Sequence, residues 1–161
     1  MVKLFKIVAA TAVFTSILAI LVASKAFSCE TDGVYPDFEC TPGSIYPVTV
    51  KEICVPGYSK TVRNTKKSVK EKVYEMYGIP VSERKGYVLD HLISLQLGGQ
   101  DSIDNLFPQR RELSPHSRDK DRIENFLKRE VCKGTMTLKE AQDQIREDWV
   151  SVWDDYMENE E

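Results

Sequence analysis

Hydrophobic residues in the second half of the chain recur at the spacing of amphipathic helices. Apolar side chains at 123, 126, 127 and 131 repeat at intervals of three and four residues, which predicts a helix from Ser114 or Ser117 to about Glu130. A longer helix should begin at a capping box, residues 137–140. Its apolar stripe comprises Leu138, Ala141, Ile145, Trp149, Val152 and Tyr156.

A third helix is expected upstream, at residues 68–77. Ser68 is a suitable N-cap, and Gly78 followed by Pro80 should end the helix. Before it, Pro and Gly residues recur throughout residues 30–58, which predicts a loop-rich arm with one short strand near residues 48–53.

Residues 87–109 lie between these helices and show a strand-like pattern. A short β-type run, residues 87–89, leads directly into Asp90 and His91. Apolar residues at 93, 95 and 97 follow at a period of two, which predicts a half-buried strand. Gly98 and Gly99 should end it, because glycine adopts turn conformations that other residues disfavour.

The beginning of the chain looks like a targeting segment. Two lysines precede a 17-residue apolar run, residues 7–23, and small residues at 24 and 26 fit a signal-peptidase site. We therefore expect a signal peptide at residues 1–26 and one domain at residues 27–161, exported to a periplasm or secreted. Because the run is almost long enough to span a bilayer, an uncleaved membrane anchor is the alternative.

The cysteine count agrees with export. All four cysteines lie beyond residue 26, and an even number in a small exported domain favours two disulfides. Three pairings are open; we favour Cys40–Cys54, which closes a short loop, and this leaves Cys29 for Cys132. A zinc site is disfavoured because the chain has no C-x-x-C pair.

Charge is unevenly distributed. The chain carries a net charge of −3, and the segment 51–72 contains seven basic residues against two acidic ones. A local excess of positive charge on an acidic chain is a candidate surface for phosphates. The nucleic-acid-binding candidates are Arg63, Lys66, Lys67, Arg110 and Lys120. Arg63 is the strongest of them because a guanidinium binds phosphate bidentately.

Lys120 and Glu124 are also i,i+4 neighbours, which suggests a surface ion pair.

The order of Asp90-His91, Gly98-Gly99, Asn105 and a later histidine, His116, resembles the HNH endonucleases of the ββα-metal superfamily. The resemblance implies an α+β fold in which a hairpin and a helix, within residues 87–130, hold a divalent metal against a phosphate. It assigns His91 as general base, Asp90 as metal ligand and Asn105 as the residue that orients the base. The family's last motif position falls at Ser114, and His116, two residues later, is the candidate for the second ligand.

Two expectations follow for the metal and the base. Mg²⁺ is the cofactor that we expect, with Mn²⁺, Ca²⁺, Zn²⁺ and Ni²⁺ as alternatives. Neighbours on a regular strand point to opposite faces, so Asp90 and His91 can reach one phosphate only where the strand ends or bulges.

The function expected from the resemblance is a metal-dependent, largely nonspecific nuclease. We expect a monomer that acts on nucleic acid, with DNA favoured over RNA, and a cognate inhibitor protein is a further partner to consider. Contact with a membrane is expected only through an uncleaved N-terminal segment. A nucleic-acid-binding module without cleavage and a structural envelope protein are the alternatives.

Overall fold

The computed structural model describes residues 28–160, so the predicted export segment lies outside the described residues. The fold is α+β, as predicted: a two-stranded antiparallel sheet with helices on both sides of it. The helices and strands are α1 (Val50–Ile53), α2 (Tyr58–Val62), α3 (Lys67–Met76), β1 (Tyr87–His91), β2 (Leu106–Arg110), α4 (Ser117–Lys133) and α5 (Leu138–Glu160). Three short 3₁₀ helices connect them: η1 (Arg84–Gly86), η2 (Leu95–Leu97) and η3 (Ile103–Asn105).

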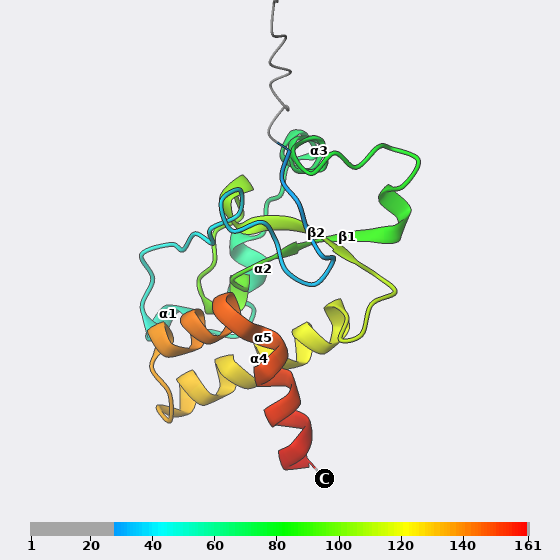
Figure 1. Ribbon diagram of the computed structural model, residues 1–161. Coiled ribbons are helices and arrows are strands. Elements are labelled where there is room, and N and C mark those ends of the chain that lie inside the picture. The colour runs from blue at the N-terminus through cyan, green and yellow to red at the C-terminus, as the bar shows by residue number, and fades with distance from the viewer. Residues whose placement is uncertain (1–27, 161) are drawn as a thin grey trace, which may run out of the picture.

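The hairpin lies between two hydrophobic clusters. In Figure 1, α3 lies on one side of β1 and β2, and α4 and α5 lie side by side on the other. Residues of α3 pack with Leu92, Leu106 and Phe107 in the first cluster. The second cluster joins α1, α4 and α5 to Ile93 and Leu97. The chain between the two strands therefore contributes to both clusters, which fixes its position on the helices.

The two C-terminal helices form as their apolar stripes predict. Ile123, Leu127 and Val131 are buried on α4, and Ala141, Ile145 and Trp149 are buried on α5. The capping box at the start of α5 is present: Thr137 Oγ accepts from the backbone N–H of Glu140, and the Glu140 carboxylate accepts from that of Thr137. Gly134, in a left-handed conformation at φ 80°, ends α4.

The strand predicted at residues 93–97 is absent. These residues form a loop with η2, and the partner of β1 is β2, in the register His91 with Leu106 and Tyr87 with Arg110. The alternation was misleading because the polar position between Ile93 and Leu95, Ser94, is also buried. Ser94 Oγ accepts from the backbone N–H of Gln96 at 3.1 Å, so this serine caps η2 instead of facing water.

Two other predictions were wrong in the N-terminal half, one of an element's type and one of a helix start. The strand expected near residues 48–53 is instead the helix α1, which begins at a capping box between Thr49 and Glu52. This T-x-x-E signal was present in the sequence and outweighs the β-branched residues around it. The third helix has Lys66 and not Ser68 at its N-cap, and Gly78, at φ 63°, follows its end.

Two disulfides are present, as predicted, but their pairing differs. Cys29 is bonded to Cys40 and Cys54 to Cys132. The first pair lies in the cluster under α3. The second connects the residue after α1 to α4, which packs on α1. The predicted Cys40–Cys54 bridge is therefore wrong: Cys54 pairs with Cys132 because α1 packs on α4, and Cys40 pairs with Cys29, at a sequence separation of 11.

The disulfides indicate a protein that works outside the reducing cytoplasm. Among residues 28–160, the structure has no helix that combines the length and the apolar character of a membrane span.

Candidate functional site

His91 is the last residue of β1, and its ring is paired with a carboxylate that sequence reasoning had not singled out. Nε2 lies 2.9 Å from Oδ1 of Asp101, and both side chains are buried, with exposed fractions of 6% and 3%. Asp101 belongs to the polar loop after the Gly98-Gly99 turn. The site therefore contains a histidine–aspartate pair that joins the end of a strand to a loop.

The loop before α3 fixes the Asp101 carboxylate. Thr65 Oγ1 donates to Oδ1 at 2.5 Å, and the backbone N–H of Asn64 donates to Oδ2. Burial alone would raise the pKa of Asp101, but the hydrogen bonds from Thr65, His91 and Asn64 hold this pKa below its usual range. Asp101 is therefore ionised at neutral pH and can orient the imidazole.

His91 is held in its neutral form. Burial lowers the pKa of His91 below its usual range, against the opposing effect of the hydrogen bond with Asp101. Since Asp101 is an acceptor, Nε2 carries the proton of the neutral ring and Nδ1 carries the lone pair. Nδ1 makes no hydrogen bond to another residue of the described range 28–160.

Asn105 shapes the loop that carries Asp101. Its side chain is fully buried: Oδ1 accepts from the backbone N–H of Ile93 at 2.9 Å, and Nδ2 donates to the carbonyls of Ile93, at 2.9 Å, and Gln100, at 2.8 Å. Gly99 fits under this amide because a Cβ there would lie 2.9 Å from Nδ2 and 1.9 Å from the Ile93 oxygen. Asn105 thus closes the loop from Ile93 to Gln100, and Asp101 is the next residue.

A cleft of about 510 Å³ opens beside His91. Three cationic side chains line it, those of Arg63, Lys70 and Arg111, and no carboxylate of the described residues does. The complete lining is Arg63, Asn64, Thr65, Lys70, Tyr74, Tyr87, Val88, Leu89, His91, Leu106 and Arg111. Such a surface suits a polyanion.

The predicted basic residues differ in their relation to this cleft. Arg63 lines it, and Lys66 lines an adjoining hollow that also contains Asn64 and Asp101. Lys67 and Arg110 are exposed, and the Arg110 guanidinium lies 5.5 Å from the centre of the Tyr87 ring. Lys70 and Arg111, which also line the cleft, were not among the candidates.

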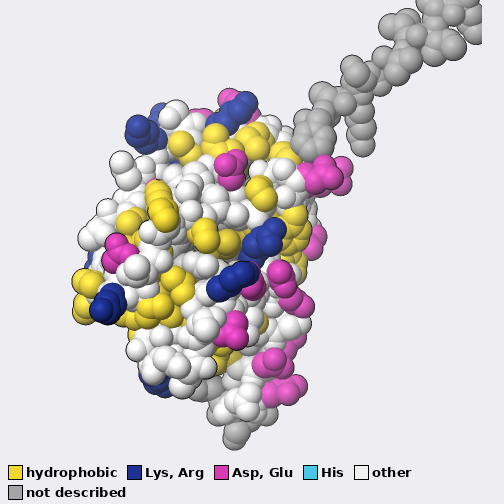
Figure 2. Space-filling view, turned by 90° about the vertical axis from the view of Figure 1, so that its left-hand side faces the viewer, with side chains coloured by type: hydrophobic (Ala, Val, Ile, Leu, Met, Phe, Trp, Pro, Cys, Tyr) yellow, Lys and Arg dark blue, Asp and Glu magenta, His cyan; other side chains and the backbone are white. Residues whose placement is uncertain are grey.

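Other surfaces of the molecule suit a phosphate less well. Figure 2 shows one face on which Asp and Glu side chains gather along one edge, and no histidine is visible there. A hollow of about 540 Å³ between α4 and the end of α5 is lined by three carboxylates, those of Glu147, Asp148 and Asp155, against one cation, Arg129. Negative potential at these places would repel nucleic acid.

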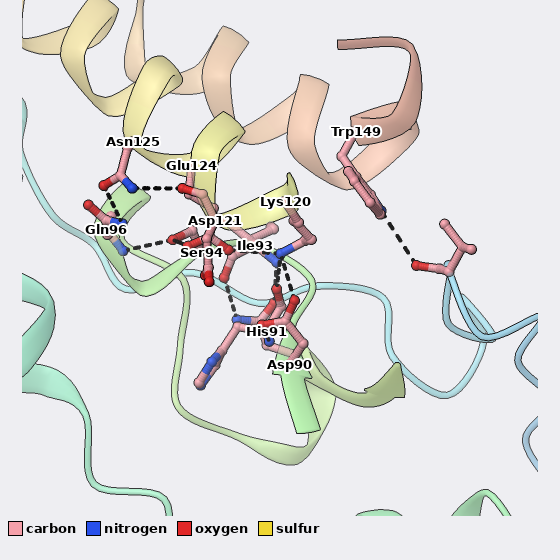
Figure 3. A network of polar contacts seen from close by, with 12 residues as sticks. Asp90, His91, Ile93, Ser94, Gln96, Lys120, Asp121, Glu124, Asn125 and Trp149 are labelled. Carbon is pink, nitrogen blue, oxygen red and sulfur yellow. Dashed lines mark hydrogen bonds and ion pairs between the residues drawn. The ribbon is translucent and has the colours of Figure 1, made fainter. Parts of the chain in front are cut away.

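Asp90 faces away from the His91 ring, toward α4, as strand alternation requires. Its Oδ1 accepts from the backbone N–H of His91 at 2.9 Å, and its Oδ2 lies 3.3 Å from Nζ of Lys120. Figure 3 shows the Lys120 side chain reaching from α4 to Asp90. Nζ also donates to the His91 carbonyl at 2.7 Å and to Oε1 of Glu124 at 2.9 Å.

Lys120 and Glu124 are therefore not the surface pair that their spacing suggested. Lys120 is completely buried and Glu124 is only 7% exposed, and the second Glu124 oxygen accepts from Ser94 Oγ at 2.7 Å. Burial alone would lower the pKa of Lys120, but the carboxylates of Asp90 and Glu124 raise it, so the ammonium stays charged. In this arrangement Lys120 cannot contact a nucleic-acid phosphate, contrary to its prediction as a binding residue.

The two predicted metal ligands are not brought together. His116 is the N-cap of α4, and its Nδ1 lies 2.8 Å from Oδ2 of Asp119, which also accepts from the His116 backbone N–H. Asp90 is paired with Lys120. Within the described residues no three His, Cys, Asp or Glu side chains are grouped so that they could hold a metal. The side chains as arranged therefore do not fit the metal centre that the resemblance implies.

Asp101 was not singled out from the sequence, nor were the cleft residues Lys70 and Arg111, and Lys120 was given the wrong role. The sequence pattern does not distinguish Asp101, since it is one polar residue in a polar loop. The pattern does distinguish Lys120, because residues 120, 123, 124, 127 and 131 share the buried stripe of α4. A lysine and a glutamate on an otherwise apolar stripe indicate a buried ion pair.

Comparisons with protein-family models, with curated proteins and with solved structures find no match for this chain.

Proposed function

We propose that the protein is an endonuclease that hydrolyses phosphodiester bonds of nucleic acid, with His91 as the general base. The observation that carries the proposal is the buried pair of His91 and Asp101 beside a cleft that three cations line. The fold alone supports it less, because one fold serves many functions.

A phosphodiester is hydrolysed when water attacks phosphorus and gives up its proton, while the bond from phosphorus to the departing oxygen breaks and that oxygen takes a proton from solvent. A neutral imidazole within reach of that water can take the proton, and a lowered pKa keeps His91 neutral at physiological pH. The hydrogen bond to Asp101 fixes the proton on Nε2 and leaves Nδ1 as acceptor. The carboxylate also stabilises the imidazolium that forms, which is the role of the aspartate in Ser-His-Asp triads.

The cationic lining supplies the second requirement, a place for the phosphate. Arg63 lies on the loop that also carries Asn64 and Thr65, the two residues that hold Asp101. Lys70 and Arg111 complete a positively charged wall. Contacts from cationic side chains to the phosphates of a nucleic acid do not depend on the base sequence, which supports a nonspecific enzyme.

The ββα-metal assignment remains part of the proposal. The order β1, β2, α4 and the role of Asn105 in closing the loop are what the resemblance implies. Mg²⁺ remains a prediction, and because Asp90 and His116 are separately paired, no step is derived through a metal ion.

The proposed setting is extracellular or periplasmic. Two disulfides suit that compartment, and removal of residues 1–26 would release the domain. DNA is the favoured substrate, the working form is proposed to be a monomer, and a cognate inhibitor would suit a protein that is dangerous to its producer.

A nucleic-acid-binding module without cleavage is the second candidate. It is favoured by one observation, the engagement of Asp90 with Lys120, which leaves the motif without a ready metal ligand. The basic cleft would serve binding equally well.

Incubation of the purified protein with plasmid DNA and with single-stranded DNA and RNA tests the proposal. The assay is run in EDTA and with Mg²⁺ or Mn²⁺. We expect nicked and linear plasmid in at least one condition. Binding without cleavage in every condition would favour the binding module, and neither binding nor cleavage would contradict both functions.

A further inference from the structure

The ammonium of Lys120 has an environment that resembles a cation site. It is fully buried, and its three partners are the Asp90 carboxylate, the Glu124 carboxylate and the main-chain carbonyl of His91 (Figure 3). Asp90 and His91 come from the end of β1, whereas Glu124 comes from α4. The cation therefore joins the hairpin to the helix.

Three converging oxygens, two of them from carboxylates, are also what a hard divalent cation prefers. An ammonium can satisfy the same oxygens because it has three N–H donors and one positive charge. Nζ donates to the His91 carbonyl at 2.7 Å and to Glu124 at 2.9 Å and forms an ion pair with Asp90 at 3.3 Å, so the charge is compensated despite complete burial.

We propose that Lys120 is a built-in cation that occupies the position between Asp90, Glu124 and the His91 carbonyl, so that Asp90 is the counter-ion of Lys120 and not a metal ligand. This reverses the role that the resemblance assigns to Asp90. It does not rest on the proposed nuclease function, because its readouts are metal binding and thermal stability and not cleavage.

The first test uses Mg²⁺ and the wild-type protein, stripped with EDTA and dialysed. Isothermal calorimetry and thermal melting are recorded with increasing Mg²⁺, for the wild type and for Asp90→Asn. The proposal expects no Mg²⁺ binding that depends on Asp90. Binding by the wild type that a folded Asp90→Asn variant has lost would overturn it, whereas equal binding by both proteins would support it.

The second test removes the built-in cation. Lys120→Ala leaves two carboxylates and a carbonyl around a cavity with no cation in it. Because the buried negative charge is then uncompensated, the melting temperature should fall by about 10 °C or more. Mg²⁺ or Ca²⁺ at about 10 mM should then restore about 4 °C, which is the shift expected for a site with a Kd of about 1 mM.

The matched control is the double variant Lys120→Ala with Glu124→Gln, which lacks one of the two carboxylates. Divalent cations should no longer raise its melting temperature, and Na⁺ at equal ionic strength should rescue neither variant. A Lys120→Ala protein that melts with the wild type would contradict the proposal, as would one that divalent cations do not stabilise. If Lys120→Ala does not fold, the wild-type and Asp90→Asn measurement decides the question.

Discussion

Replacement of Asn105 by alanine should destabilise the fold far more than the loss of one polar side chain on the surface would. The buried amide makes three hydrogen bonds of 2.8–2.9 Å with the main chain of Ile93 and Gln100. Each contributes about 1 kcal/mol net, and alanine also leaves the buried N–H of Ile93 without an acceptor, which costs about 1 kcal/mol or more. The expected loss is roughly 4 kcal/mol, or about 12 °C in melting temperature.

The assay is thermal unfolding, monitored by circular dichroism. No reductant is added, so that both disulfides stay intact. Asn105→Asp is the informative companion, because it keeps the size but turns a carboxylate oxygen toward two carbonyl oxygens, and it should lose at least as much. Asn159→Ala, at an exposed position of α5, is the control and should stay within about 0.5 kcal/mol of the wild type. An Asn105→Ala protein that melts within about 2 °C of the wild type would refute the role given to this amide.

Three further outcomes can be checked, each by its own measurement. Gly99→Ala should destabilise the loop, because the added Cβ would collide with the Ile93 carbonyl, and a melting curve equal to that of the wild type would contradict this. Arg63→Ala should weaken binding of labelled DNA and reduce its dependence on salt, as measured by fluorescence anisotropy at several NaCl concentrations. Removal of the Cys54–Cys132 bridge by a double alanine substitution should lower the free energy of unfolding by about 4 kcal/mol, since the bridge spans 78 residues, and urea unfolding measures this.

The helices α3, α4 and α5 could be predicted because their signals are local. A repeat of apolar residues at three and four positions gave α4 and α5, and the same repeat gave most of α3. The capping box before α5 set its start. Each of these signals lies within a few residues of the element that it defines, so no knowledge of the tertiary structure was needed.

The loop between the strands could not be predicted from periodicity. Residues 92–95 are all buried, and the hydrogen bonds that an adjacent strand would supply to Ile93 come from the side chain of Asn105. An alternating pattern identifies a strand only where one face meets water. In this loop the chain lies between two hydrophobic clusters, so the alternation carried no information.

Only some of the residues around His91 could be singled out from the sequence, because the others depend on how the loop folds. The motif identified His91 and Asn105 as the residues of interest, and the structure places both in one hydrogen-bonded loop region. The partner of His91, Asp101, depends on how the loop folds back onto the strand, which spacing does not specify. The Cys54–Cys132 bridge also depends on a contact between helices that are far apart in the sequence, so the spacing of the cysteines did not determine it.

The measurement that tests the central claim most directly compares cleavage and binding by wild-type protein and His91→Ala. If His91 is the base, cleavage of DNA should fall by roughly 10²- to 10⁴-fold in the variant, while binding to the same DNA should change little. The wild-type rate should also be full above the pKa of His91 and fall as pH drops through that value, which burial places below 6.5. The two proteins must melt at similar temperatures for the comparison to hold. A folded His91→Ala protein that cuts DNA at the wild-type rate would contradict the account.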